Sequence, residues 1–261
     1  MTQPSLAGRA ALVCGASQGI GRATALALAA RGADVTVLAR RAERLEALVP
    51  ELLHAGASHA EPLPADLDDL DGLTETLAGR LARGPVHVVV NNTGAPPSGL
   101  LLDASVEGMG RALSRHLFAA HTIMQAVLPG MEAAGYGRFV QVLSTSVREP
   151  IPNIGLSNIS RAAVASWAKT LSRELPPGVT TNNVLPGFTD TERLSGLAGE
   201  ASARSGLTRD EVYANYVRVT PEGRLGRPAE IAAAIAFLCS PDAAFIRGVS
   251  LAVDGGRLHS I

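Results

Sequence analysis

Cysteines, net charge and long hydrophobic runs are all scarce in this sequence, and each scarcity excludes a class of protein. Cys14 and Cys239 are too few for a disulfide framework and lack the spacing of metal ligands. We therefore expect buried thiols, no metal site and a reducing compartment. No apolar run approaches the roughly 20 residues of a membrane helix, and Met1–Arg9 lacks the apolar core of a secretory signal. These features predict a soluble, cytoplasmic protein.

The charge balance argues against polyanionic partners. The chain has 23 Lys+Arg and 24 Asp+Glu, a formal net charge of −1, which gives no basic field for nucleic acid or for a membrane surface. With 261 residues, 46% of them hydrophobic, the chain is long enough to bury a sizeable core, and no shift in composition marks a linker. We expect a single domain over residues 1–261 that acts on a small molecule.

Short Val- and Leu-rich runs alternate with longer Ala- and Leu-rich stretches along the chain. Continuous apolar strands separated by helical segments predict a parallel sheet covered on both faces, a doubly wound Rossmann-type α/β fold. Strands are expected at Ala10–Cys14, Val35–Ala39, Val86–Asn91, Phe139–Leu143, Val179–Leu185 and Val249–Val253. Helices are expected at Gly21–Arg31, Arg41–Ala55, Leu67–Arg83, Gly108–Ala134, Ile159–Leu175 and Pro228–Leu238.

The segment Thr189–Arg227 interrupts this alternation. It is rich in Ser, Gly and charged residues, with short helical patterns inside. Long insertions in compact domains are usually lids or binding loops, so we expect a lid over a substrate here. Its apolar residues permit an organic substrate; they are Leu194, Leu197, Val212 and Val217.

A glycine-rich loop lies where the first strand meets the first helix. It comprises Gly15, Ala16, Ser17, Gln18, Gly19, Ile20 and Gly21. Glycines at such a junction let the chain turn sharply and approach a pyrophosphate, which binds the free N–H groups at the positive end of the helix dipole. A tight turn alone would also need glycine, but the position between strand and helix favours a dinucleotide site.

The GxxxGxG spacing of this loop resembles that of the short-chain dehydrogenase/reductase family. Further matches follow in order: Asp66-Leu67 after the third strand, Asn91-Asn92-Thr93-Gly94 after the fourth, Pro186-Gly187 after the sixth, and Val253-Asp254-Gly255-Gly256 near the end. Cys14 and Thr93 depart mildly from the family's usual Thr and Ala. The resemblance implies that Asp66 and Leu67 contact the adenine, that Asn92, Gly94, Pro186 and Gly187 line the cofactor cleft, and that Ile20 and Thr189 touch the cofactor.

The end of the second strand bears on the choice of cofactor. A carboxylate there would bind the ribose hydroxyls of NAD(H), whereas a cation accommodates the extra phosphate of NADP(H). Here Ala39 is followed by Arg40 and Arg41, so Arg40 favours NADP(H) over NAD(H). The alternative is that both arginines simply begin a solvated helix face.

The reaction centre departs from the family pattern. Ser144 aligns with the family's substrate-orienting serine, but the Tyr and Lys of its YxxxK motif are replaced by Ser157 and Arg161, and its usual Asn by His116. A serine hydroxyl is a far weaker acid than a phenol next to a lysine, and Arg161 stays protonated, so neither replaces the usual proton donor.

Other proton donors are conceivable. His116 is the one member of this group that titrates near neutrality, although it lies on an apolar face typical of a core histidine. A phenol could come from Tyr136, Tyr213 or Tyr216, most of which we expect to be packing residues.

Three interpretations remain open. The first is an NADP(H)-dependent oxidoreductase with an unusual proton donor. The second keeps hydride transfer but uses an imine or activated alkene as acceptor, and the third is a non-redox isomerase, lyase or cofactor-binding protein. The chain also resembles a divergent branch of 3-oxoacyl-carrier-protein-reductase-like proteins in which the Tyr and Lys are similarly replaced. Analogy with the family implies a homodimer or homotetramer formed through Gly108–Ala134, Ile159–Leu175 and the stretch after Val249.

Overall fold

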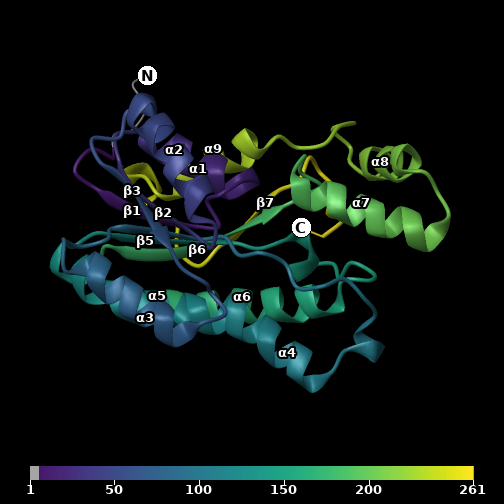
Figure 1. Ribbon diagram of the computed structural model, residues 1–261, viewed down its shortest axis with the longest axis horizontal. Helices are drawn as coiled ribbons and strands as arrows, with labels where there is room; N and C mark the ends of the chain where they lie inside the picture. The colour runs from purple at the N-terminus through teal and green to yellow at the C-terminus, as the bar shows by residue number, and fades with distance from the viewer. Residues whose placement is uncertain (1–5, 261) are drawn as a thin grey trace.

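A computed structural model describes residues 6–260, and Figure 1 shows its layered arrangement. The stretch Met1–Arg9, for which no secretory signal is predicted, lies partly outside this range. Seven parallel strands form one sheet in the order β3-β2-β1-β4-β5-β6-β7. The strands are β1 Ala10–Cys14, β2 Asp34–Ala39, β3 Ala60–Pro64, β4 Val88–Asn91, β5 Gly137–Val142, β6 Val179–Pro186 and β7 Ser250–Val253.

Helices cover both faces of the sheet, as the buried apolar strands require. Helices α1, α2 and α9 pack on one face, and α3, α5 and α6 on the other (Figure 1). This arrangement confirms the predicted doubly wound Rossmann-type fold. The helices are α1 Gly19–Ala29, α2 Ala42–Ala55, α3 Leu70–Leu81, α4 Val106–Leu113, α5 Ala119–Ala133, α6 Gly155–Glu174, α7 Glu192–Ser205, α8 Arg209–Arg218 and α9 Pro228–Leu238.

Strand β3 has no predicted bounds because its sequence, AEPLP, has little β-propensity. It lies at the edge of the sheet, where two prolines cost no inter-strand hydrogen bond. The helix expected over Gly108–Ala134 is interrupted by a π-helical turn at Ser114–Phe118, which separates α4 from α5. Such turns are single widened turns inserted in an α-helix, and they are frequent at functional sites.

Helices α7 and α8 lie within the 189–227 insertion and project beyond the carboxyl edge of the sheet (Figure 1). None of the helices described in residues 6–260 combines the length and apolarity that crossing a membrane requires. The thiols of Cys14 and Cys239 are free and buried, and burial raises the pKa of each to about 12.

Two glycines at the start of α1 are required by close packing. Gly15 has φ +60°. A Cβ on Gly21 would lie 2.2 Å from the Gly15 carbonyl oxygen and 2.7 Å from Nδ2 of the Asn92 side-chain amide. That amide donates to the Gly15 carbonyl across 3.3 Å, joining the loop after β4 to the loop after β1. The glycines thus hold two loops together at the carboxyl edge of the sheet.

This packing predicts opposite effects for the same substitution at two helical glycines. Gly21→Ala should lower the free energy of unfolding by about 1–3 kcal/mol, because the methyl group meets backbone that cannot move away. Gly79→Ala in α3, where nothing lies within 4 Å of the new methyl group, should raise it by about 0.5–1 kcal/mol. Urea unfolding of the two variants measures the difference, and a stabilised Gly21→Ala protein would contradict the packing argument.

Candidate active site

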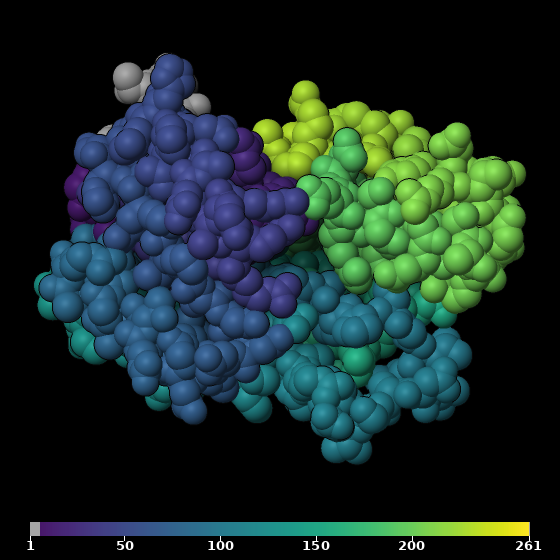
Figure 2. Space-filling view, in the orientation of Figure 1, coloured from purple at the N-terminus to yellow at the C-terminus, as the bar shows by residue number. Residues whose placement is uncertain are grey.

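A cleft of about 800 Å³ runs along the carboxyl edge of the sheet, where ligands of doubly wound folds bind. Loops after β1 to β6 form one wall and α7 forms the other, and Figure 2 shows the hollow between the α7–α8 pair and the rest of the molecule. All but two of the residues predicted for the site line this cleft. The two exceptions are Gly21 and His116.

The glycine-rich loop presents free N–H groups to the cleft. No side chain caps the first turn of α1, and that turn has no acidic residue. The first-turn N–H groups and the positive end of the helix dipole are therefore available to an anion. Gly19 has φ +56°, and only Thr191 approaches the position of a Cβ there. The loop fits a pyrophosphate.

The end of β2 presents cations to the same cleft. Arg41 and Arg44 both donate to the Gln18 side-chain oxygen, across 2.7 and 2.8 Å. Arg40 is exposed and has no hydrogen-bond or ion-pair partner within residues 6–260. Asp66 and Leu67 line the neighbouring part of the cleft after β3. Arg40 is thus free to bind a phosphate.

The opposite end of the cleft contains Ser144, Ser157 and Arg161. Ser157 and Arg161 lie one turn apart on α6, and the Arg161 Nε donates to the Ser157 hydroxyl oxygen across 3.0 Å. Nη1 donates to the carbonyls of Val142 and Leu143 at 3.0 and 2.9 Å, which ties α6 to the end of β5. Ser144 accepts a hydrogen bond from the Ser146 N–H.

Arg161 has donors to spare. Within the described residues, neither its Nη2 group nor the Ser157 hydroxyl hydrogen has an acceptor. The Arg161 side chain is only 9% exposed, and no carboxylate pairs with it in the described part of the chain. Burial, with help from the Arg193 charge, lowers the pKa of Arg161 to about 10, so it remains a cation at neutral pH.

His116 lies behind this end of the cleft, in the π-helical turn. Its ring is 4% exposed; Nδ1 is 2.8 Å from the Ser160 hydroxyl, and Nε2 is 3.2 Å from the Gly94 carbonyl. Burial, reinforced by the Arg161 charge, lowers the pKa of His116 to about 3, so the ring is neutral near pH 7. A neutral ring that donates to Gly94 must carry its proton on Nε2, so Nδ1 is an acceptor that faces the Ser160 hydroxyl, for which the Leu156 carbonyl at 2.7 Å is a second acceptor. Both nitrogens are then engaged inside the protein.

Among the lysine and the three tyrosines of the chain, one tyrosine lines the cleft. The chain has one lysine, Lys169, which donates to the Gly248 carbonyl and does not line the cleft. Of the three tyrosines, Tyr136 is buried and donates to the Cys239 carbonyl, and Tyr213 stacks edge-on against Tyr216. Only Tyr216 lines the cleft, and burial raises the pKa of its phenol.

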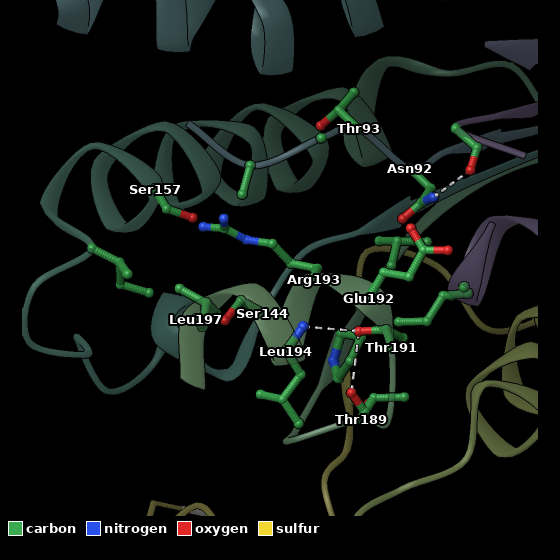
Figure 3. A pocket seen from close by; sticks show the side chains of 18 of the residues that line it. Asn92, Thr93, Ser144, Ser157, Thr189, Thr191, Glu192, Arg193, Leu194 and Leu197 are labelled. Atoms are coloured by element: carbon green, nitrogen blue, oxygen red, sulfur yellow. Dashed lines mark hydrogen bonds between the residues drawn. The ribbon is translucent and has the colours of Figure 1, made fainter. Parts of the chain in front are cut away.

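Helix α7 contributes cleft residues that the sequence did not single out. Thr191 caps the helix by accepting the Leu194 N–H, and its hydroxyl donates to the Thr189 carbonyl (Figure 3). Arg193 extends from the first turn of α7 toward Ser157. The sequence of a polar insertion does not predict which way a charged side chain points, so the position of Arg193 in the cleft could be found only from the structure. Of the four apolar residues predicted for the lid, Leu194 and Leu197 line the cleft; Val212 and Val217 do not.

Comparison with known proteins gives consistent matches over nearly the whole chain. The enoyl-(acyl carrier protein) reductase family model matches residues 15–257. The 3-oxoacyl-[acyl-carrier-protein] reductase FabG of Vibrio harveyi is 34% identical over 255 residues, 97% of this chain and 98% of that protein. L-sorbose reductase from Gluconobacter frateurii, complexed with NADPH and L-sorbose, superposes with a TM-score of 0.93 at 25% identity over 100% of both chains. A 3-oxoacyl (acyl-carrier-protein) reductase from Agrobacterium tumefaciens with NADP bound gives 0.86 at 29% identity, over 97% and 95% of the chains.

The buried, neutral His116 predicts how stability depends on pH. The pKa of His116 is lower in the folded than in the unfolded chain, so protons bind the unfolded chain more strongly below pH 6.5. The free energy of unfolding therefore decreases as the pH is lowered from 6.5 to about 3. Between pH 7 and pH 5 this group should cost about 2 kcal/mol. Urea unfolding at both pH values should therefore show a loss about 2 kcal/mol larger for the wild type than for His116→Asn, which does not titrate. Equal losses would mean that folding does not lower the pKa of His116.

Proposed function

The chain belongs to the short-chain dehydrogenase/reductase family, and from this premise we propose that it is an NADP(H)-dependent oxidoreductase acting on a small organic C=O, C=N or activated C=C bond. We further propose that it belongs to a divergent branch that works without the family's Tyr and Lys. The observation that carries this mechanism is the unpaired Arg161 guanidinium beside Ser157, at the end of the cleft where the family has those two residues.

The cofactor part of the proposal rests on the fit of the cleft. The uncapped start of α1 with Gly15 and Gly19 would hold the pyrophosphate, Asp66 and Leu67 would contact the adenine, and Arg40 would pair with the additional phosphate. The other predicted contacts line the same cleft: Ser17, Gln18, Ile20, Asn92, Gly94, Pro186, Gly187 and Thr189. NADPH or NADP in the two solved relatives supports this choice over NAD(H).

The side chains around the reaction centre bind negative charge and do not transfer protons. When bound, the nicotinamide supplies or accepts a hydride. The Nη2 group of Arg161 and the Ser157 hydroxyl would hold the substrate heteroatom as negative charge develops on it, and Ser144 would orient it. With a pKa of about 10, buried Arg161 retains its proton at neutral pH. The proton therefore comes from water.

This arrangement favours acceptors that need no strong acid. An imine is protonated before it reacts, and an activated alkene forms an enolate, which a guanidinium stabilises while water protonates the carbon. A simple ketone gives an alkoxide, which must take a proton at once. An activated C=C bond thus suits Ser157 and Arg161 better than an isolated carbonyl, and a C=N bond suits the lack of an acid because it carries its own proton.

The insertion and the surface complete the proposal. We propose that α7 and α8 act as the lid, since α7 lines the cleft and projects beyond the sheet. We propose a homodimer or homotetramer through α4 to α6 and β7, supported by apolar residues exposed there, namely Val106, Phe118 and Leu251. Cytoplasmic location stays a prediction.

A non-redox isomerase, lyase or cofactor-binding role is the second candidate. The observation that favours it is the lack, along the cleft of the described residues, of any His, Tyr or Lys with a pKa near neutrality. It predicts that NADPH binds and is never oxidised.

Arg40→Gln should weaken the binding of NADPH about tenfold and leave NADH binding unchanged, because the guanidinium contacts only the extra phosphate. Fluorescence titration of both cofactors measures the effect. Arg173→Gln, which alters an exposed arginine outside the cleft, is the matched control and should bind NADPH like the wild type. Equal weakening of NADH would place Arg40 away from the phosphate.

The reaction itself is tested by the loss of NADPH absorbance with ketones, imines and enones. We expect turnover with imines or enones at least tenfold above that with simple ketones, because the site lacks an acid. The double variant Ser157→Tyr, Arg161→Lys should gain ketone reduction. NADPH binding without oxidation by any acceptor would replace this proposal by the non-redox candidate.

A further inference from the structure

We infer that the substrate is an organic acid whose carboxylate binds between Arg193 on α7 and Arg161 on α6. The inference rests on the proposed function and deepens it, because it names the class of molecule that the reductase site accepts. It is carried by the arginines at this end of the cleft, which no side chain neutralises.

Neither arginine has an anionic partner within residues 6–260. Arg161 donates only to Ser157 and to two backbone carbonyls, and Arg193 has a single long contact of 3.5 Å to the Pro96 carbonyl. Two carboxylates line the cleft. Asp66 lies at the end with Arg40, and Glu192 lies 3.7 Å from Arg44. Both carboxylates therefore lie toward the cofactor end of the cleft and do not pair with Arg161 or Arg193.

The placement of Arg193 is unfavourable without a ligand. It lies in the first turn of α7, where the positive end of the helix dipole repels a cation. Its charge also repels that of Arg161. Burial lowers the pKa of Arg161, and the nearby Arg193 charge lowers it further. An anion bound between the two guanidinium groups removes both penalties at once.

The geometry suits a carboxylate attached to an apolar body. Arg193 extends across the cleft toward Ser157 (Figure 3), whose hydroxyl accepts from the Arg161 Nε, so both guanidinium groups and Ser157 lie at the same end of the cleft. A planar carboxylate matches forked guanidinium donors. Apolar side chains line the walls around this region, namely Leu143, Ile154, Leu194 and Leu197.

The position of the carboxylate also limits the reacting bond. Nη2 of Arg161 has two hydrogens, one for the carboxylate and one for the heteroatom of the reacting bond, which Ser157 also binds. The carboxylate and the reacting bond must then be adjacent in the substrate. This describes an α-oxo or α-imino acid. In an α,β-unsaturated acid the carboxylate itself takes both hydrogens, because it carries the charge that develops when hydride adds to the β-carbon.

The test uses cinnamate and its neutral isostere cinnamamide as probes. Calorimetric titration of the NADP⁺-saturated protein should give a dissociation constant at least tenfold lower for cinnamate, and Arg193→Gln should abolish most of this preference. Arg218→Gln on α8, an exposed arginine of the same lid that does not line the cleft, should keep it. Arg193→Lys should keep part of the preference.

Equal affinities for cinnamate and cinnamamide would overturn the inference, as would a preference reduced equally by Arg218→Gln, because the effect would then be one of overall charge. Tighter binding of phenylphosphonate than of cinnamate would overturn the assignment to a carboxylate. NADP⁺ binding is measured first. If NADP⁺ does not bind, the proposed function fails, and the same titrations on the free protein still decide whether the arginines select a carboxylate.

Discussion

The Arg161 guanidinium, buried on carbonyl oxygens at the end of β5, is the interaction on which the reaction centre depends. Its planar fork donates in one direction to Val142 and Leu143, in a second to Ser157, and leaves Nη2 for the cleft. An ammonium group has no such fixed geometry. Burying a cation without a carboxylate is costly, and the carbonyl dipoles only partly offset the lost hydration. A site with this deficit is prepared for an anion.

His116, Arg161 and Tyr216 have shifted pKa values, and none of the three titrates near neutral pH. His116 loses its proton readily and is sealed behind the cleft, Arg161 keeps its proton, and burial weakens Tyr216 as an acid. Enzymes that move protons set the pKa of a group close to the working pH. Here burial moves the pKa values of His116 and Tyr216 away from neutrality, and the pKa of Arg161 stays well above it although burial lowers it. These pKa values agree with the proposed mechanism, in which the site stabilises charge and water supplies the proton.

Strong local patterns predicted most of the fold. β1 begins and ends where its apolar run does, and α9 begins at the proline and ends at the leucine that bound its pattern. Most residues of the glycine-rich loop and of the motifs after β3, β4 and β6 meet along one cleft, because parallel strands all end at the same edge. The bounds of β3 could not be predicted, because its two prolines are unusual in strands and it is held in the sheet by pairing with β2. The π-helical turn and the direction of Arg193 depend on tertiary packing, which periodicity does not encode.

The single lysine has a chemical consequence for the cleft. Lys169 is bonded to the Gly248 carbonyl away from it, so no side-chain amine borders the substrate. An aldehyde or ketone bound there has no nucleophilic nitrogen with which to condense, and an imine has none with which to exchange. Electrophilic molecules can therefore occupy the cleft without forming a Schiff base with a lysine side chain.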